Sequence, residues 1–309
     1  MRRNFANLFA ATASCALLAS CFGGDGDSPT PTPSPTPSPS PSPSPSPTPT
    51  PVATDFDFAK AFTASAVNTA YSYAFFTPNG GSETWSDGTR RDGLSRITYT
   101  VSPQSADFDW PDTATLTTFV AADLQSSTAT RLAFRKGTDG LAMELPFKHV
   151  LRVTYESAQS FMQNTVTGTL RAFRVALFYN TVTTTADITS NLAYTGSAQV
   201  TGGKAGTTPP GVFSSPATTL TVAASDKKLT GSIQIFENVG GTPTLRATLP
   251  ISATVASSGA FTGAIDDTAN GFKGQFVGSL AGPAREEIVL IFNVAHTDGR
   301  EFIGSYIGD

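Results

Sequence analysis

Alternating apolar and polar positions predict that the larger part of this 309-residue chain folds as β-strands. Residues 147–155 and 169–177 alternate with a period of two, which is typical of strands that have one buried and one exposed face. Glycine-containing turns at 79–81 and 137–140 separate such segments. A helical pattern is limited to residues 58–67, where we expect a short helix. The pattern as a whole predicts an all-β fold.

Beyond residue 188 the pattern changes to short strands at even spacing. Eight strands are expected there, at residues 191–201, 219–224, 229–237, 245–255, 260–265, 271–280, 288–295 and 301–307. Eight antiparallel strands suffice to close an up-and-down barrel, and closure leaves no unpaired strand edge. Five glycines inside these strands would permit the tight coiling of a small barrel: Gly231, Gly263, Gly274, Gly278 and Gly304.

The first 20 residues have the features of a cleaved export signal. Arg2 and Arg3 supply a positive start, and the apolar run 5–19 is too short to span a bilayer. The run ends in Leu18-Ala19-Ser20-Cys21, which resembles the bacterial lipobox, in which the cysteine thiol carries the lipid. We therefore expect Cys21 to be acylated, palmitate included, and to hold the protein stably on a membrane.

Cys15 is a poorer candidate for lipid attachment because Thr12 stands where the lipobox has an aliphatic side chain. Phe22 follows Cys21 in place of the aspartate that retains lipoproteins in the inner membrane, so we expect sorting to the outer membrane and display at the cell surface. Between residues 29 and 51 every odd position is proline, and such a chain builds no packed core. Residues 21–52 are therefore expected to form a disordered linker.

The charge balance argues against nucleic acid as a partner. Charged residues make up 14% of the chain and its net charge is −4, so no basic surface is expected to follow a phosphate backbone. Both cysteines lie within the first 21 residues, which leaves the folded part without a disulfide. We expect the folded part to consist of a β-rich domain at 53–187 and the barrel domain at 188–309.

Three runs near the C-terminus resemble the barrel of transferrin-binding protein B. They are Ser258-Gly259-Ala260-Phe261-Thr262-Gly263, Gly271-Phe272-Lys273-Gly274-Gln275-Phe276-Val277-Gly278 and Ala281-Gly282-Pro283-Ala284-Arg285-Glu286-Glu287. Residues 192–196 resemble the opening strand of that barrel, and residues 220–231 resemble its strand-turn-strand with a lysine in the turn. The chain departs from the family pattern at 288–292, where Ile-Val-Leu-Ile-Phe replaces the usual glycine and phenylalanine.

This resemblance, over 188–309, implies a surface lipoprotein whose barrel is preceded by a handle domain, here 53–187. It implies binding of a solute or a host protein, for example in iron or haem acquisition alongside an outer-membrane receptor. Variable loops and the handle carry recognition in this family, so no ligand-binding residue is transferred. The alternative is a structural or envelope-assembly lipoprotein that docks a protein partner.

Reactive side chains are few. His149 and His296 could bind haem or a metal or act as a general base, but each stands alone in the sequence. No cluster with metal-ligand spacing, no nucleophile motif and no phosphate-binding glycine loop occurs. Glu286 and Glu287 are adjacent, and adjacent strand residues face opposite sides, so joint acid–base catalysis is not expected. We therefore expect no enzyme activity, no metal site and no cofactor.

Two groups remain as candidate binding residues. Asp107, Asp109 and Asp112 surround Trp110 and could bind calcium or a carbohydrate, although an acidic loop with a packed tryptophan explains them equally well. An exposed patch for a protein partner could form from five aromatic residues, for most of which core burial is the alternative interpretation: Tyr71, Tyr73, Phe75, Phe76 and Trp85.

Overall fold

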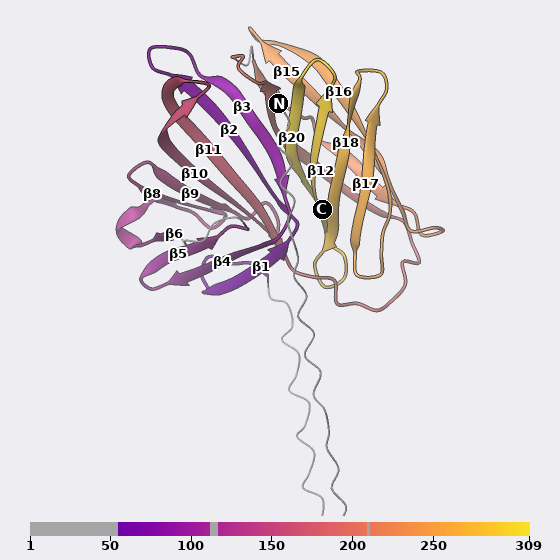
Figure 1. The fold of residues 1–309 in the computed structure, drawn as a ribbon. Coiled ribbons are helices and arrows are strands. Elements are labelled where there is room, and N and C mark those ends of the chain that lie inside the picture. The colour runs from indigo at the N-terminus through magenta and orange to yellow at the C-terminus, as the bar shows by residue number, and fades with distance from the viewer. Residues whose placement is uncertain (1–54, 112–116, 209–210) are drawn as a thin grey trace, which may run out of the picture. The chain divides into compact units, whose positions relative to one another are not determined.

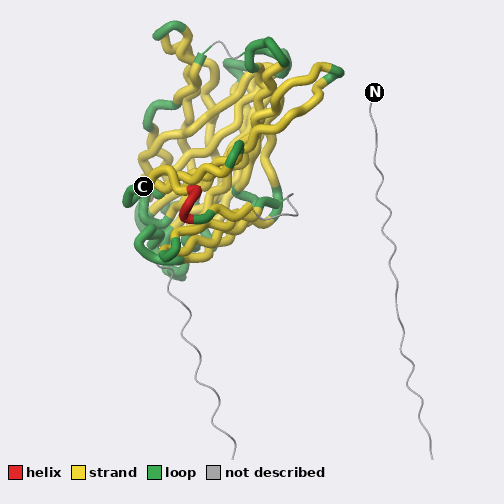
Figure 2. Tube along the Cα trace, turned by 90° about the vertical axis from the view of Figure 1, so that its left-hand side faces the viewer, coloured by secondary structure: helices red, strands yellow, loops and turns green. Residues whose placement is uncertain are grey.

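The computed structural model describes residues 55–111, 117–208 and 211–309, and these residues belong to one compact unit. The predictions made for residues 1–52, including lipid attachment at Cys21 and the proline-rich linker, lie outside the described residues. Figure 1 shows two groups of strands side by side, one N-terminal and one C-terminal. Strands account for nearly all of the regular structure (Figure 2), beside one 3-10 turn in the described chain, η1 (Ala121–Asp123).

The N-terminal group, which we call the handle, consists of two antiparallel sheets. The smaller sheet has the strand order β1-β4-β5-β6, and the larger has the order β3-β2-β11-β10-β9-β8-β7. The strands are β1 (Phe62–Val67), β2 (Ala70–Pro78), β3 (Thr84–Arg91), β4 (Leu94–Val101), β5 (Gln104–Asp109), β6 (Thr117–Phe119), β7 (Leu124–Ser127), β8 (Arg131–Lys136), β9 (Asp139–Glu144), β10 (Val150–Gln163) and β11 (Val166–Tyr179).

The inner faces of the two handle sheets enclose a hydrophobic core. Alternate residues of β10, namely Leu151, Val153 and Tyr155, lie in this core, and β4 contributes Ile97 and Tyr99 from the other sheet. The period of two seen in the sequence places all of these side chains on the inner faces. The intervening side chains of β10 and β11 point to the opposite face of the sheet, where they are available for packing against the C-terminal group.

The C-terminal group forms the predicted barrel. Its strands are β12 (Leu192–Lys204), β13 (Val212–Ser214), β14 (Thr218–Val222), β15 (Lys228–Val239), β16 (Thr242–Thr254), β17 (Ala260–Asp267), β18 (Phe272–Ala281), β19 (Glu287–His296) and β20 (Arg300–Gly308). The eight predicted strands correspond to β12 and β14–β20, and β13 is a short additional strand paired with β15. The all-β fold class with an antiparallel up-and-down barrel is thus confirmed.

Closure of the barrel depends on two different seams. β20 returns to pair with β12 over nine residues, from Gly196↔Gly308 to Lys204↔Arg300. Between β16 and β17 the described residues form no backbone ladder. These strands are instead joined by a turn in which the Ala256 N–H donates to the Ala260 carbonyl, and by the Asp267 carboxylate, which accepts the Thr248 N–H at 2.7 Å.

Two glycines of the barrel accommodate aromatic rings. In the β17–β18 ladder Gly278 lies opposite Phe261, and Gly263 lies opposite Phe276. A Cβ atom on either glycine would come within 2.6 Å of the facing ring, which is too close for any real side chain. The glycine-x-phenylalanine spacing of this region therefore allows each ring to cover the neighbouring backbone.

A second apolar cluster joins the handle to the barrel. Val175 and Leu177 on the outer face of β11 pack with Val289 and Ile291 of β19 and with Ile303 of β20. The intervening residues of β19 face the barrel core, so β19 is buried on both faces. A strand with two buried faces is apolar at consecutive positions, which accounts for the unbroken apolar run at 288–292.

The helix predicted at 58–67 is wrong. Phe58 lies in a turn, and Phe62–Val67 form β1, which pairs with β4. Phe62 and Ala64 pack against the handle core at a period of two, and this cross-strand packing overrides the short helical pattern. Within the described part of the chain, no helix is long and apolar enough to cross a membrane.

Candidate functional site

The outer face of the larger handle sheet carries a row of aromatic side chains beside the barrel. The β2–β11 register pairs Tyr73 with Phe173 and Phe75 with Arg171. Because side chains alternate along a strand, these four side chains share the face that packs on the barrel. Trp85 of the adjoining strand β3 lies against the same row.

The rings in this row contact one another closely. Tyr73 stacks on Phe173 with ring centroids 4.7 Å apart, and the Trp85 ring lies parallel to Tyr73 at 6.2 Å. The Arg171 guanidinium lies 5.0 Å from the centre of the Phe173 ring and 5.4 Å from that of Phe75. These cation–π contacts hold the planar guanidinium of Arg171 against the two rings.

Arg171 is held by carboxylates as well as by rings. Its Nε and Nη2 donate to the two carboxylate oxygens of Glu83 at 3.0 and 2.8 Å, and its Nη1 lies 3.6 Å from Glu156. The hydrogen bonds to Glu83 are the main reason that the pKa of Arg171 is raised, so the group stays charged at every physiological pH. A fixed cation between half-buried rings is therefore a permanent feature of this face.

A groove runs between this row and the barrel. Its volume is about 420 Å³, and we call it the aromatic groove. Tyr73, Phe173 and Thr154 line it on the handle side, while residues 198–201 and 213–215 line it on the barrel side. Burial raises the pKa of Tyr73, so its phenol stays protonated and is able to donate a hydrogen bond into the groove.

The five aromatic residues predicted to form one exposed patch occupy different environments in the structure. Tyr71 and Trp85 are buried in the contact between handle and barrel, and Phe76 faces the opposite side of the sheet. Tyr73 is half-buried and lines the groove, whereas Phe75 is half-buried but does not line it. The sequence-based interpretation missed Phe173 and Arg171, although both occupy the same face of the alternating segment 169–177.

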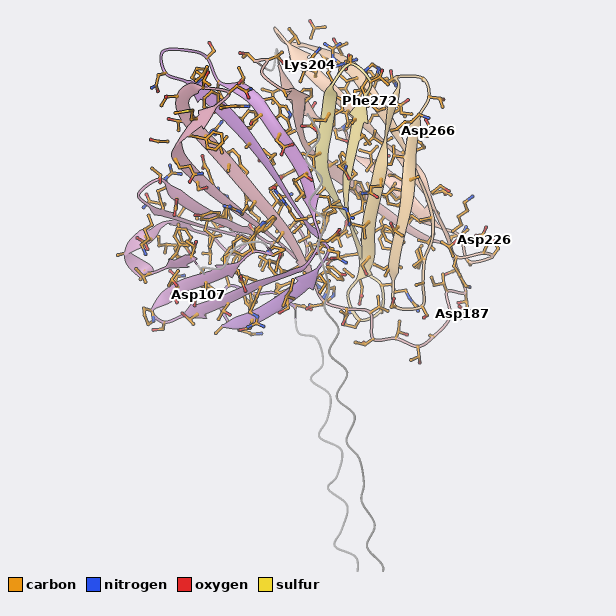
Figure 3. The ribbon with its side chains drawn as sticks, in the orientation of Figure 1. Asp107, Asp187, Lys204, Asp226, Asp266 and Phe272 are labelled. Atoms are coloured by element: carbon orange, nitrogen blue, oxygen red, sulfur yellow. The ribbon has the colours of Figure 1, made fainter. Side chains whose placement is uncertain are left out.

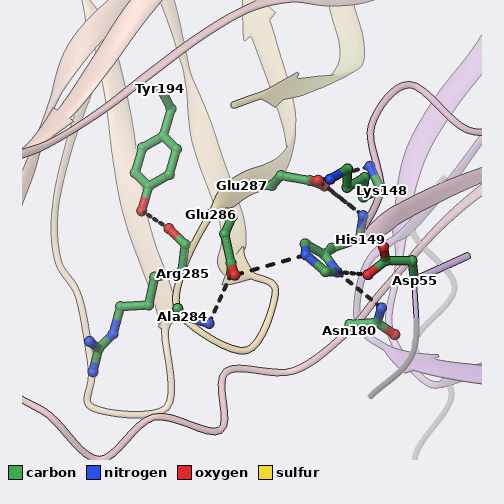
Figure 4. Close-up of polar contacts among 9 residues, drawn as sticks. All are labelled: Asp55, Lys148, His149, Asn180, Tyr194, Ala284, Arg285, Glu286 and Glu287. Carbon is green, nitrogen blue, oxygen red and sulfur yellow. Dashed lines mark hydrogen bonds and ion pairs between the residues drawn. The ribbon is translucent and has the colours of Figure 1, made fainter. Parts of the chain in front are cut away.

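A polar cluster joins the two parts of the body at the base of β19 (Figure 4). Glu287 accepts the backbone N–H of Lys148 at 2.9 Å and that of His149 at 3.0 Å. The His149 imidazole lies 3.5 Å from Asp55 and 4.0 Å from Glu286. Burial raises the pKa of Glu287, and the two backbone hydrogen bonds oppose this effect. We call these residues the junction cluster.

The junction cluster corrects one expectation from the sequence. Glu286 and Glu287 were expected to face opposite sides of a strand, but both approach the segment that contains His149. The reason is that β19 begins at Glu287, so Glu286 belongs to the preceding loop and does not follow the strand alternation. The His149 side chain is only 9% exposed and is engaged by neighbours on both ring nitrogens.

The other candidate residues are dispersed. His296 pairs with Asp298 at 2.8 Å in the turn before β20. Trp110 is buried against Phe108 in the handle core, which agrees with the packed-tryptophan interpretation. Asp112 lies outside the described residues. Among the residues that the structure describes, no three His, Cys, Asp or Glu side chains form a group able to hold a metal ion.

Comparisons with known proteins give structural neighbours alone, since neither a family model nor a curated protein matches the sequence. The isotype 1 transferrin-binding protein B of serogroup B Neisseria meningitidis aligns with a TM-score of 0.42 at 10% identity, over 77% of this chain and 43% of its own. A mutant of the transferrin-binding protein B of Haemophilus parasuis Hp5 aligns with a TM-score of 0.36 at 12% identity, over 79% of this chain and 58% of its own. A DUF3598-family protein of unknown function from Nostoc punctiforme aligns with a TM-score of 0.26. The chain thus spans less than two thirds of either transferrin-binding protein.

Proposed function

We propose that this chain is a lipoprotein anchored through Cys21 in the outer membrane and displayed at the cell surface, where it binds a protein partner in the aromatic groove. The lipobox ending in Cys21 and the proline-rich segment that follows support the anchored, projecting arrangement. The observation that carries the binding function is the half-buried pair Tyr73 and Phe173, stacked beside Arg171 at the edge of the groove.

The chemistry of the groove favours a protein as ligand. Tyrosine, tryptophan and arginine side chains dominate the energetics of protein–protein contacts because they combine a large apolar area with few freely rotating bonds and a polar end. Arg171 does not line the groove but lies against Phe173 beside it, and Glu83 holds it in place, so a partner that extends past the groove would meet a preorganised cation. Phe173 and Tyr73 present the apolar area.

The same groove is less suited to binding haem. Haem iron takes an axial ligand from histidine, methionine, cysteine or tyrosinate. The described residues that line the groove contain none of the first three, and the raised pKa of Tyr73 disfavours the tyrosinate form. Iron acquisition through this groove would therefore proceed by capture of an iron-carrying protein, in concert with an outer-membrane receptor.

We propose no catalytic role for the chain. His149 is engaged in the junction cluster, and the backbone N–H and the carboxylate of Asp298 both lie within hydrogen-bond distance of Nδ1 of His296. Neither histidine lines the aromatic groove. Turnover on ester or glycoside panels that is lost on substitution of one of these histidines would contradict this part of the proposal.

The test of anchoring and display uses the full chain on cells. We expect labelled palmitate to be incorporated into the wild type and into Cys15→Ser but not into Cys21→Ser. Protease added to intact cells should remove the protein. Protection until the outer membrane is broken would place it in the periplasm and overturn surface display.

The test of the groove compares two phenylalanines. Phe173→Ala should weaken capture of serum proteins by displaying cells at least about tenfold, as expected for a central contact residue. Phe161→Ala is the matched control, since Phe161 is 40% exposed near the end of β10 and does not line the groove. Equal capture by both variants would rule out the groove. Capture of an envelope protein in place of a serum protein would support the envelope-assembly alternative.

A further inference from the structure

We propose that the end of the barrel near Lys204 and Phe272 contains a second binding site, which accepts a small molecule with an apolar ring, an amine and a carboxylate. Figure 3 shows Lys204 and Phe272 at one end of the barrel, with Asp187 and Asp226 toward the other end. A pocket of about 370 Å³ lies at this end, and we call it the barrel-mouth pocket. Its volume falls within the range of small-molecule sites.

A buried carboxylate supplies the first recognition group. Leu229, Ile233 and Ile235 of β15 point into the barrel core, and Glu237 takes the next inward position of the same alternation. The residue is only 4% exposed. A carboxylate at a core position requires hydrogen-bond donors for both of its oxygens, because burial without partners is costly.

Only one of the two oxygens of Glu237 has a partner. Its Oε2 accepts the Nε–H of Arg246 at 2.8 Å, whereas the buried Oε1 has no hydrogen-bond partner among the described residues. A register shift in the β15–β16 ladder leaves Arg246 unpaired in the ladder and beside Glu237. Bulges of this kind redirect side chains next to binding sites. Because Glu237 lines the barrel-mouth pocket, its unpartnered Oε1 is the acceptor for a donor that enters the pocket.

Aromatic rings form the apolar wall of the pocket. Phe213 of β13 contacts Phe302 of β20 with ring centroids 5.1 Å apart, and both line the cavity. Phe302 also packs on Phe272 at 4.8 Å, which continues the wall into the barrel core. A ligand ring can therefore pack against aromatic faces while its donor group reaches Glu237.

A free cation at the rim supplies the third recognition group. The Arg300 guanidinium is paired with Asp298 at 2.7 Å, and Arg246 is paired with Glu237. Lys204 lines the pocket, is exposed, and makes no ion pair with any described residue. The pocket therefore presents one unpaired acceptor and one unpaired ammonium group on either side of an apolar wall. An aromatic amino acid carries the three matching groups.

The barrel-mouth pocket and the aromatic groove share Phe213, but Glu237 and Lys204 line the pocket and not the groove, so substitutions at these two residues test the pocket alone. The experiment is titration calorimetry of the full-length chain with L-phenylalanine and L-tryptophan. We expect saturable binding of one molecule per chain. N-acetylphenylalanine, which lacks the ammonium group, and phenylalanine methyl ester, which lacks the carboxylate, should each bind at least about tenfold more weakly, as expected for the loss of a charge-assisted hydrogen bond.

Two variants assign the binding groups. Glu237→Gln and Lys204→Ala should each weaken binding of L-phenylalanine at least about tenfold, and Lys228→Ala, an exposed lysine at the opposite end of β15, should leave it unchanged. Lys204 is exposed, so Lys204→Ala keeps the test valid if Glu237→Gln disturbs folding. Absence of saturable binding by both amino acids, or unchanged binding in Lys204→Ala, would overturn the proposal.

Discussion

The indole N–H of Trp85 donates a hydrogen bond of 2.7 Å to the carboxylate of Glu301, and this bond connects handle strand β3 to barrel strand β20. Figure 1 shows these two strands next to each other. Trp85 is fully buried, and burial raises the pKa of Glu301 while the indole hydrogen bond opposes that effect. The contact between handle and barrel therefore combines apolar packing with a directed polar interaction.

Trp85→Phe should lower the free energy of unfolding by about 3 kcal/mol, because it removes a hydrogen bond to a charged acceptor and leaves a small cavity. Trp110→Phe is the matched control, since Trp110 is also buried but its indole N–H has no partner among the described residues. Urea denaturation of both variants measures the difference. Equal losses would show that the Trp85 hydrogen bond contributes nothing to stability.

The raised pKa of Glu287 predicts a pH dependence of stability. Because the folded protein disfavours the charged carboxylate, the contribution of Glu287 is fully present below the unfolded pKa of about 4.3 and is lost as the pH rises through the folded pKa. Glu287→Gln should flatten the fall in unfolding free energy across this window. Part of the fall should remain, since the pKa of Glu301 is raised in the same direction.

Thermal unfolding of wild type and Glu287→Gln between pH 4 and pH 8 measures this effect. Glu286→Gln serves as the control, because Glu286 belongs to the same junction cluster but its side chain is 45% exposed and lies in the loop before β19. A wild-type stability that rises with pH over the same window, with no change of slope in Glu287→Gln, would contradict the assignment.

Lys227, the lysine in the turn between β14 and β15, has a structural role. Its ammonium donates to the carbonyls of Ile188 at 2.7 Å and Ala224 at 2.8 Å, and so fastens the β14–β15 turn to the segment that leads into β12. Lys227→Met should lower the free energy of unfolding by about 1–2 kcal/mol. The neighbouring Lys228→Met should change it by less than about 0.5 kcal/mol, because that side chain is exposed. Chemical denaturation of the two variants measures both changes in the free energy of unfolding.

Local patterns predicted many of the strands because β15, β16 and β17 each alternate between buried and exposed positions. The segment 229–237 was predicted as a strand, but Glu237 was not singled out there, although it continues the spacing of Ile233 and Ile235 and so lies on the inward face. The sequence could not show that Oε1 lacks a partner, because that depends on the β16 bulge and on Arg246.

The aromatic groove could not be predicted from the sequence, for a different reason. Tyr73 and Phe173 are separated by a hundred residues, and their stacking follows from the pairing of β2 with β11. No local signal specifies such a pairing, although each strand by itself reveals which of its residues share a face. The helix expected at 58–67 failed for the same reason, since β1 exists through its pairing with distant β4.

The seam between β12 and β20 sets an order of events during biogenesis. The handle strands pair entirely within residues 62–179 and can complete their sheets before the C-terminal part of the chain has been synthesised. The barrel is different, because β12 keeps one edge open until residues 300–308 have emerged to meet it. During that interval the edge can recruit foreign strands, so a chaperone that shields it would be required most by chains stalled before their last strand.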